Sequence, residues 1–181
     1  MAEEQEFTPP EMCKTNLLDL CNEVVRILDG LYKEKKIDFN PVLVSFGQGL
    51  LSKYEPDVIM DNFIKNTYEH WPKIEQKDEN FFLDNATDLL KDYPVGDLNP
   101  FKQIFINDDI DDDDKELLWE YFDSLVKIAI IHIHEQRKPF YIINEDGNKK
   151  KSYSKDHQYQ PQVGIVKMAN LFQIKLEWPE D

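Results

Sequence analysis

The densest group of ionisable side chains lies in the segment NDDIDDDDKELLWEYFDSLVKIAIIHIHEQRKP, residues 107–139. Its six aspartates between Asp108 and Asp114 carry oxygen ligands of the kind that Ca²⁺ prefers, but they are also the residues that begin helices. A calcium loop needs alternating ligands over about twelve residues, with a glycine near the middle and a closing bidentate glutamate. This segment has no glycine and leads directly into a long apolar stretch. It therefore predicts a helix start with solvated carboxylates and no metal site.

The histidines and cysteines have spacings that do not suit a shared metal ion. His132 and His134 are two residues apart, so on a helix they point about 200° from each other and cannot act as an i, i+4 ligand pair. We expect His132 to be partly buried and His134 to be exposed. Cys13 and Cys21 lie on one predicted helix about 12 Å apart, beyond disulfide reach, and form no CxxC motif. Both are predicted to be free, mostly buried thiols in a reducing compartment.

Motifs for nucleophilic catalysis and nucleotide binding are missing from the sequence. It has no GxSxG elbow, no Walker A loop and no GxGxxG motif after a strand. Carboxylates are so abundant that no pair can be singled out as a general acid and base. We therefore predict a protein that is not an enzyme and that uses no cofactor.

The charge of the chain favours basic partners. Its formal net charge is -15 and its pI is about 4.6, while 41% of its residues are hydrophobic, enough for a folded core. Such a field repels nucleic acids and anionic membranes, which makes direct nucleic-acid binding unfavourable. The run NKKKSYSK, residues 148–155, is the one basic stretch, and we expect it to be a solvated loop. The acidic start MAEEQEFTPPE lacks the regions of a signal peptide, and no apolar run reaches the length of a membrane span, so we expect a cytosolic protein that is not secreted.

The apolar periodicity predicts a mainly α fold, a compact multi-helix bundle. Helices are expected from Glu11 to about Lys36, from an N-cap at Asp57 to a break or bend near Trp71 and Pro72, and over shorter stretches within residues 76–94, ending before Pro94, and at residues 99–105. Between about residues 113 and 136 the chain is apolar around most of a helix, which predicts the central helix of the domain. Residues 1–10 are expected to be a flexible acidic N-terminus, residues 11–140 the helical domain and residues 141–181 a C-terminal extension packed on the same domain.

The C-terminal extension has a different pattern. The turn NEDGN between Phe140–Ile143 and Lys151–Ser154 predicts a small β-hairpin or an irregular loop. A helical turn is expected near residues 166–172, followed by strand-like alternation at Ile174, Leu176 and Trp178. Trp178 either docks back on the bundle, which we favour, or anchors a partner.

Three segments carry a family resemblance: FIKNTYEHWPKIEQKDENFFLDNATDLL, NPFKQIF and ELLWEYFDSLVKIAIIHIHEQRKPF, between Phe63 and Phe140. Their order resembles a family of uncharacterised helical proteins encoded by nucleocytoplasmic large DNA viruses. The resemblance implies a viral protein of the host cytoplasm or the virion, and it transfers no catalytic residues. The residues that match the family pattern are Trp71, Asp78, Phe81, Phe82, Trp119, Tyr121 and Phe122. We expect the aromatic ones among them in the core more often than in a binding site.

Together these features predict a non-enzymatic module that binds another protein with a basic surface, as an adaptor, scaffold or complex subunit. One alternative is an acidic decoy that imitates nucleic acid, and another is a minor structural or assembly protein of the virion. Self-association is also open. The predicted partner-binding residues are Trp178, Tyr159, Asp111, Asp112 and Asp113.

Overall fold

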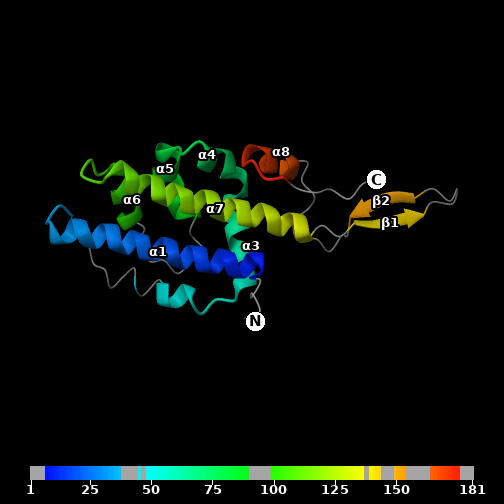
Figure 1. Ribbon diagram of the computed structural model, residues 1–181, viewed down its shortest axis with the longest axis horizontal. Helices are drawn as coiled ribbons and strands as arrows, with labels where there is room; N and C mark the ends of the chain where they lie inside the picture. The colour runs from blue at the N-terminus through cyan, green and yellow to red at the C-terminus, as the bar shows by residue number, and fades with distance from the viewer. Residues whose placement is uncertain are drawn as a thin grey trace, which may run out of the picture.

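The computed structural model describes residues 7–37, 45, 48–89, 99–136, 139–143, 149–153 and 164–175, and it confirms a mainly α-helical fold (Figure 1). Two long helices, α1 (Pro9–Lys33) and α7 (Asp112–Gln136), are accompanied by shorter helices. These are α3 (Pro56–Thr67), the 3₁₀ turn η1 (Tyr68–His70), α4 (Trp71–Glu75), α5 (Glu79–Leu89), α6 (Asn99–Ile106) and α8 (Gly164–Leu171). None of the helices in the described ranges is long and apolar enough to cross a membrane.

The start of α1 is set by a capping box. The carboxylate of Glu11 accepts hydrogen bonds from the backbone N–H and the hydroxyl of Thr8, both at 2.8 Å. These bonds hold the pKa of Glu11 below its usual value. The helix consequently begins at Pro9, before the expected start at Glu11, because proline is well suited to the first turn, where its missing N–H leaves no bond unmade.

The boundaries of α3 correct one prediction and confirm another. Asp57 is not the N-cap: Glu55 occupies that position and Pro56 is the first helical residue, so Asp57 lies in the first turn. Pro56 determines where α3 begins, because its fixed φ suits the first helical position better than the end of the preceding segment. At the other end, the chain bends as predicted near Pro72, where α3 gives way to η1 and then to α4.

Helices α1 and α8 end in the same type of turn, in which a residue other than glycine has a positive φ. After α1, Lys35 has a φ of 59°, and the N–H of Lys36 donates to the carbonyl of Leu31 at 2.9 Å. This Schellman motif ends α1 at Lys33, earlier than predicted. After α8, Gln173 has a φ of 57° and the N–H of Ile174 donates back to Ala169 at 2.8 Å, so Ile174 closes a helix and does not begin the predicted strand.

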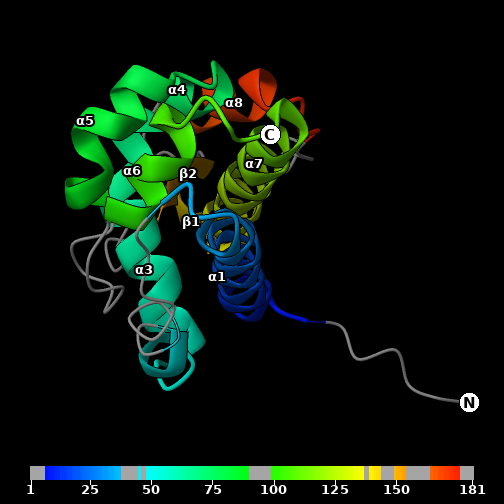
Figure 2. The ribbon, with the colours of Figure 1, turned by 90° about the vertical axis from the view of Figure 1, so that its left-hand side faces the viewer.

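The central position predicted for residues 113–136 is confirmed. Helix α7 packs against α1, α3, α4 and α8. Figure 2 looks along α1 and α7, which lie side by side, and shows α3, α5 and α6 on one flank of this pair. The buried side chains of α7 are Leu118, Trp119, Phe122, Leu125, Val126, Ile128, Ala129, Ile130, His132 and Ile133.

The aromatic residues named for the family resemblance lie mostly in this core. Trp71, Phe82, Trp119 and Phe122 are buried, whereas Phe81 and Tyr121 are partly exposed and pack on the edge of the core. Both cysteines are buried and free, as predicted. Burial raises the pKa of Cys13 to about 12 and that of Cys21 to about 11, so neither thiol ionises near neutral pH.

The predicted hairpin is present in the C-terminal extension. Strands β1 (Pro139–Ile143) and β2 (Lys149–Tyr153) pair antiparallel, with Tyr141 opposite Lys151. Part of the lysine run expected as a loop therefore forms β2. Figure 1 shows the hairpin projecting beyond the C-terminal end of α7, while α8 returns to pack on α7 and α4.

Candidate interaction surface

The loop between α6 and α7 is held in place by one apolar side chain and by local hydrogen bonds. Ile110 is buried, and its N–H donates to the carbonyl of Asn107 at 3.2 Å. The side-chain oxygen of Asn107 accepts the N–H of Asp109 at 2.9 Å. With the loop anchored inward at Ile110, the aspartates around it stay at the surface.

Asp111 lies immediately before the first residue of α7, at the helix start that the sequence predicted. Its carbonyl accepts the N–H of Asp114 at 3.1 Å and of Lys115 at 3.2 Å, and its carboxylate lies 3.5 Å from the N–H of Asp113. Asp112 and Asp113 occupy the first turn, where the positive end of the helix dipole stabilises carboxylates. We call the exposed residues Asp108, Asp109, Asp111, Asp112 and Asp113 the acidic end.

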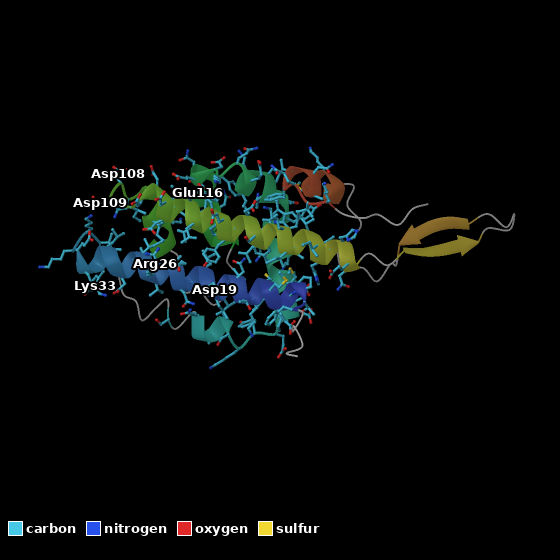
Figure 3. All side chains as sticks on the ribbon, viewed as in Figure 1. Asp19, Arg26, Lys33, Asp108, Asp109 and Glu116 are labelled. Atoms are coloured by element: carbon cyan, nitrogen blue, oxygen red, sulfur yellow. The ribbon has the colours of Figure 1, made fainter. Side chains whose placement is uncertain are left out.

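Cations on other elements fix the flanks of the acidic end. Arg26 on α1 donates to Asp114 at 2.7 Å, and Lys36 lies 3.8 Å from Asp109. Figure 3 labels Arg26 on α1 and Asp108 and Asp109 in the loop before α7. Lys77, in the turn before α5, pairs with Glu116. Such exposed pairs contribute only about 0–1 kcal/mol each, so their effect is to orient the start of α7 against its neighbours.

Four carboxylates of the acidic end form no ion pair with a residue that the structure describes. Among the residues that the structure describes, Asp108, Asp111, Asp112 and Asp113 make no ion pair. Residues 107–116 contain seven carboxylates and a single lysine. The local potential is therefore strongly negative, and it is accessible to a positively charged partner.

The negative surface continues along the seam between α1 and α7. Burial and the carboxylates of Glu23 and Asp19 on α1 raise the pKa of Tyr121 on α7. Asp19 is on the same helix as Arg26, further from the acidic end (Figure 3). A basic partner longer than the acidic end could therefore follow this seam.

Apolar side chains lie beside these charges. Ile106, which immediately precedes the loop, is 55% exposed, and Tyr32 near the end of α1 is 48% exposed. Tyr32 also lines a shallow pocket of about 550 Å³ with Lys33, Lys35, Lys36 and Ile37. Because Lys36 pairs with Asp109, this pocket adjoins the acidic end. The sequence predicts a helix to about Lys36 and gives no indication of this pocket.

The structure brings together three of the five predicted partner-binding residues. Asp111, Asp112 and Asp113 are consecutive, exposed and held at the start of a rigid helix. Trp178 and Tyr159 lie outside the described residues. Sequence reasoning missed Arg26 and Lys77, because their contacts join segments far apart in the chain and no local pattern indicates them.

The histidines of α7 differ in environment. His132 is buried, with 5% of its surface exposed, whereas His134 is half-buried, so the prediction that it is exposed was wrong. Among the described residues, no group of three or more histidine, cysteine or carboxylate side chains could hold a metal ion.

We expect His132 to make the protein less stable in mild acid. Burial lowers its pKa, while Asp61 and Asp57 on α3 and Glu135 on α7 partly oppose this effect. Because the folded pKa lies below the unfolded value of 6.5, the unfolded chain binds the proton more tightly. The stabilisation is complete above pH 6.5 and is lost as the pH falls toward the lower, folded-state pKa.

The measurement is the free energy of unfolding by urea between pH 7.5 and 5, for the wild type and for His132→Gln. The wild type should lose stability below about pH 6.5 and the variant should show a flatter profile. The lowered pKa values of Glu11 and Asp78 act only below about pH 4.5, outside this window. Parallel pH profiles for the two proteins would contradict the assignment to His132.

Comparison with known proteins found no related protein. The chain matches no family model, no curated protein and no solved structure. The resemblance to giant-virus proteins therefore stays a prediction. What the protein does is inferred from the acidic end and its surroundings.

Proposed function

We propose that this protein is a non-enzymatic interaction module, an adaptor or subunit, whose acidic end binds a basic surface of another protein. The observation that carries the proposal is the set of exposed aspartates without cationic neighbours among the described residues, Asp108, Asp111, Asp112 and Asp113. They lie in the loop before α7 and in its first turn, and the buried side chains of α7 hold this helix in the core. Because the helix is fixed by the fold, little conformational entropy is lost when a partner binds.

The apolar neighbours of the acidic end favour a specific protein partner over a purely electrostatic decoy. Ile106 and Tyr32 give the surface apolar area beside its charges. In protein interfaces, a small apolar centre supplies much of the affinity, while surrounding charges set the association rate and the orientation. A surface that only imitated nucleic acid would need charge alone. The viral setting in the infected cytoplasm or the virion is part of the proposal and rests on the resemblance.

The experiment is affinity capture with the tagged protein from a eukaryotic cell lysate, and from infected cells where a virus carries the gene, with partners identified by mass spectrometry. The test variant is the triple change Asp111→Asn, Asp112→Asn and Asp113→Asn. It removes three charges and keeps the side-chain shapes, and asparagine remains a good capping residue. We expect it to lose at least about ten-fold in partner recovery, since several charge contacts disappear together.

The matched control is Glu55→Gln, Asp57→Asn and Glu135→Gln, which changes the net charge by the same amount. Asp57 and Glu135 both act on His132 near the C-terminal end of α7, far from the acidic end, and all three control residues are exposed. The control should recover the partner like the wild type. Equal losses in both variants would show an effect of total charge and would favour the decoy. Recovery by the acidic-end variant at wild-type levels would exclude this surface as the binding site.

A further inference from the structure

The hairpin presents two strand edges, and the residues on these edges are very different. In the part of the chain that the structure describes, the sheet contains β1 and β2 alone, so each strand has an outer edge that no described strand pairs with. The substantial contacts of each strand are with the other strand. A two-stranded hairpin on its own is only marginally stable in water, so a further strand would stabilise it.

The outer edge of β2 is protected and that of β1 is not. Strand β2 has the sequence KKKSY, and lysines on an edge strand disfavour pairing with another strand. Strand β1 has the sequence PFYII, with no charge and with β-prone residues after the proline. Pro139 is the first residue of β1, where its missing N–H costs the least pairing. The edge open to another strand is therefore that of β1.

We propose that β1 pairs with β1 of a second copy of this chain, giving an antiparallel four-stranded sheet in the order β2, β1, β1, β2. A two-fold axis requires the same strand on both sides, and antiparallel pairing of β1 with itself satisfies this. Since β1 has no charge, the pairing sets no like charges opposite each other, and the lysines of both copies stay on the outer strands.

The position of the hairpin suits such a dimer. It projects from the C-terminal end of α7, whereas the acidic end lies at the N-terminal end of the same helix (Figure 1). Two copies joined through their hairpins therefore keep their acidic ends apart, which limits the repulsion between two chains that each carry a net charge of -15. Two strands of five residues bury much less than a standard interface of about 1,600 Å², so the dimer forms mainly at high protein concentration.

The test is sedimentation equilibrium of the full chain over a roughly hundred-fold range of protein concentration, because dimer formation depends on protomer concentration. The wild type should shift from monomer toward dimer as the concentration rises. The dimer should persist or strengthen at high salt, since salt screens the repulsion between the acidic copies while backbone pairing is unaffected.

The variant Tyr141→Glu should prevent dimer formation while it keeps the hairpin. Residue 141 lies opposite Lys151, so a glutamate there makes a favourable cross-strand pair within the hairpin. In a pair of β1 strands centred on this residue, two glutamates face each other. We expect this variant to remain monomeric at every concentration. The matched control Ser152→Glu adds the same charge to β2 and should dimerise like the wild type.

Amide hydrogen exchange gives a second readout. Amides in residues 140–143 should gain protection with concentration in the wild type and not in Tyr141→Glu, and a cross-strand Overhauser effect between residues 141 and 151 checks that the variant keeps its hairpin. A dimer of Tyr141→Glu as strong as that of the wild type would overturn the proposal. A wild type that stays monomeric throughout would overturn it as well. These outcomes do not depend on whether the acidic end binds a basic partner.

Discussion

Replacing Phe82 by alanine should lower the free energy of unfolding by about 3–5 kcal/mol. Phe82 is 1% exposed, and its ring packs against Phe105 at 5.0 Å, Phe122 at 5.1 Å and Trp119 at 6.0 Å between ring centroids. These rings come from α5, α6 and α7, so Phe82 joins the shorter helices to the central one. Truncation leaves a cavity that the three large rings, one on α6 and two on α7, cannot refill without moving.

The measurement is urea unfolding followed by tryptophan fluorescence and by circular dichroism, with Phe7→Ala as the control. Phe7 is 57% exposed, so its truncation should change stability by less than about 0.5 kcal/mol. A loss below about 1 kcal/mol for Phe82→Ala would show that α5 is loosely packed on α7, and it would contradict the described core.

Replacing Thr67 by valine should cost about 1–3 kcal/mol, because it leaves a buried donor without an acceptor. Thr67 is 3% exposed; its hydroxyl donates to the carbonyl of Phe63 at 2.7 Å and accepts the indole N–H of Trp71 at 2.9 Å. Trp71 is completely buried, so water cannot replace the lost acceptor. These bonds connect the last turn of α3 to the first residue of α4 across the bend.

A double-mutant cycle with Trp71→Phe isolates this hydrogen bond. In the Trp71→Phe background the indole N–H is gone, so Thr67→Val should cost at least about 1 kcal/mol less than in the wild type. Thr67→Ser keeps the hydroxyl and should lose only the contribution of a methyl group, about 1 kcal/mol. Equal costs of Thr67→Val in the two backgrounds would show that the indole N–H does not depend on the Thr67 hydroxyl.

The sequence predicted the long elements well because their apolar spacing is a direct consequence of burial. The central helix was predicted at about residues 113–136 and lies at Asp112–Gln136. The ends of the helices were predicted less accurately, because neighbouring residues compete for the capping position. Asp57 is a better capping residue than Glu55, but Pro56 fixes the start of α3 and excludes it. Similarly, Lys35 and Gln173 adopt positive φ, a conformation that their residue types do not indicate.

The candidate surface was predictable only in part. A run of aspartates before an apolar helix is enough to place Asp111, Asp112 and Asp113 at an exposed helix start. Which carboxylates remain without cations depends on Arg26, Lys36 and Lys77, which come from other elements and meet α7 only through the tertiary fold. The burial of His132 among carboxylates of two helices likewise follows from the packing of α3 on α7.

The most direct test of the central claim is a titration of the captured partner against the wild type, the acidic-end variant and its charge-matched control, at low and at high salt. Wild-type affinity should fall as salt rises without vanishing, because Ile106 and Tyr32 add contacts that salt does not screen. The acidic-end variant should bind more weakly at low salt and respond less to salt, whereas the control should follow the wild type. If the acidic-end variant keeps both the affinity and the salt dependence of the wild type, the partner binds elsewhere and the proposed function of the acidic end is wrong.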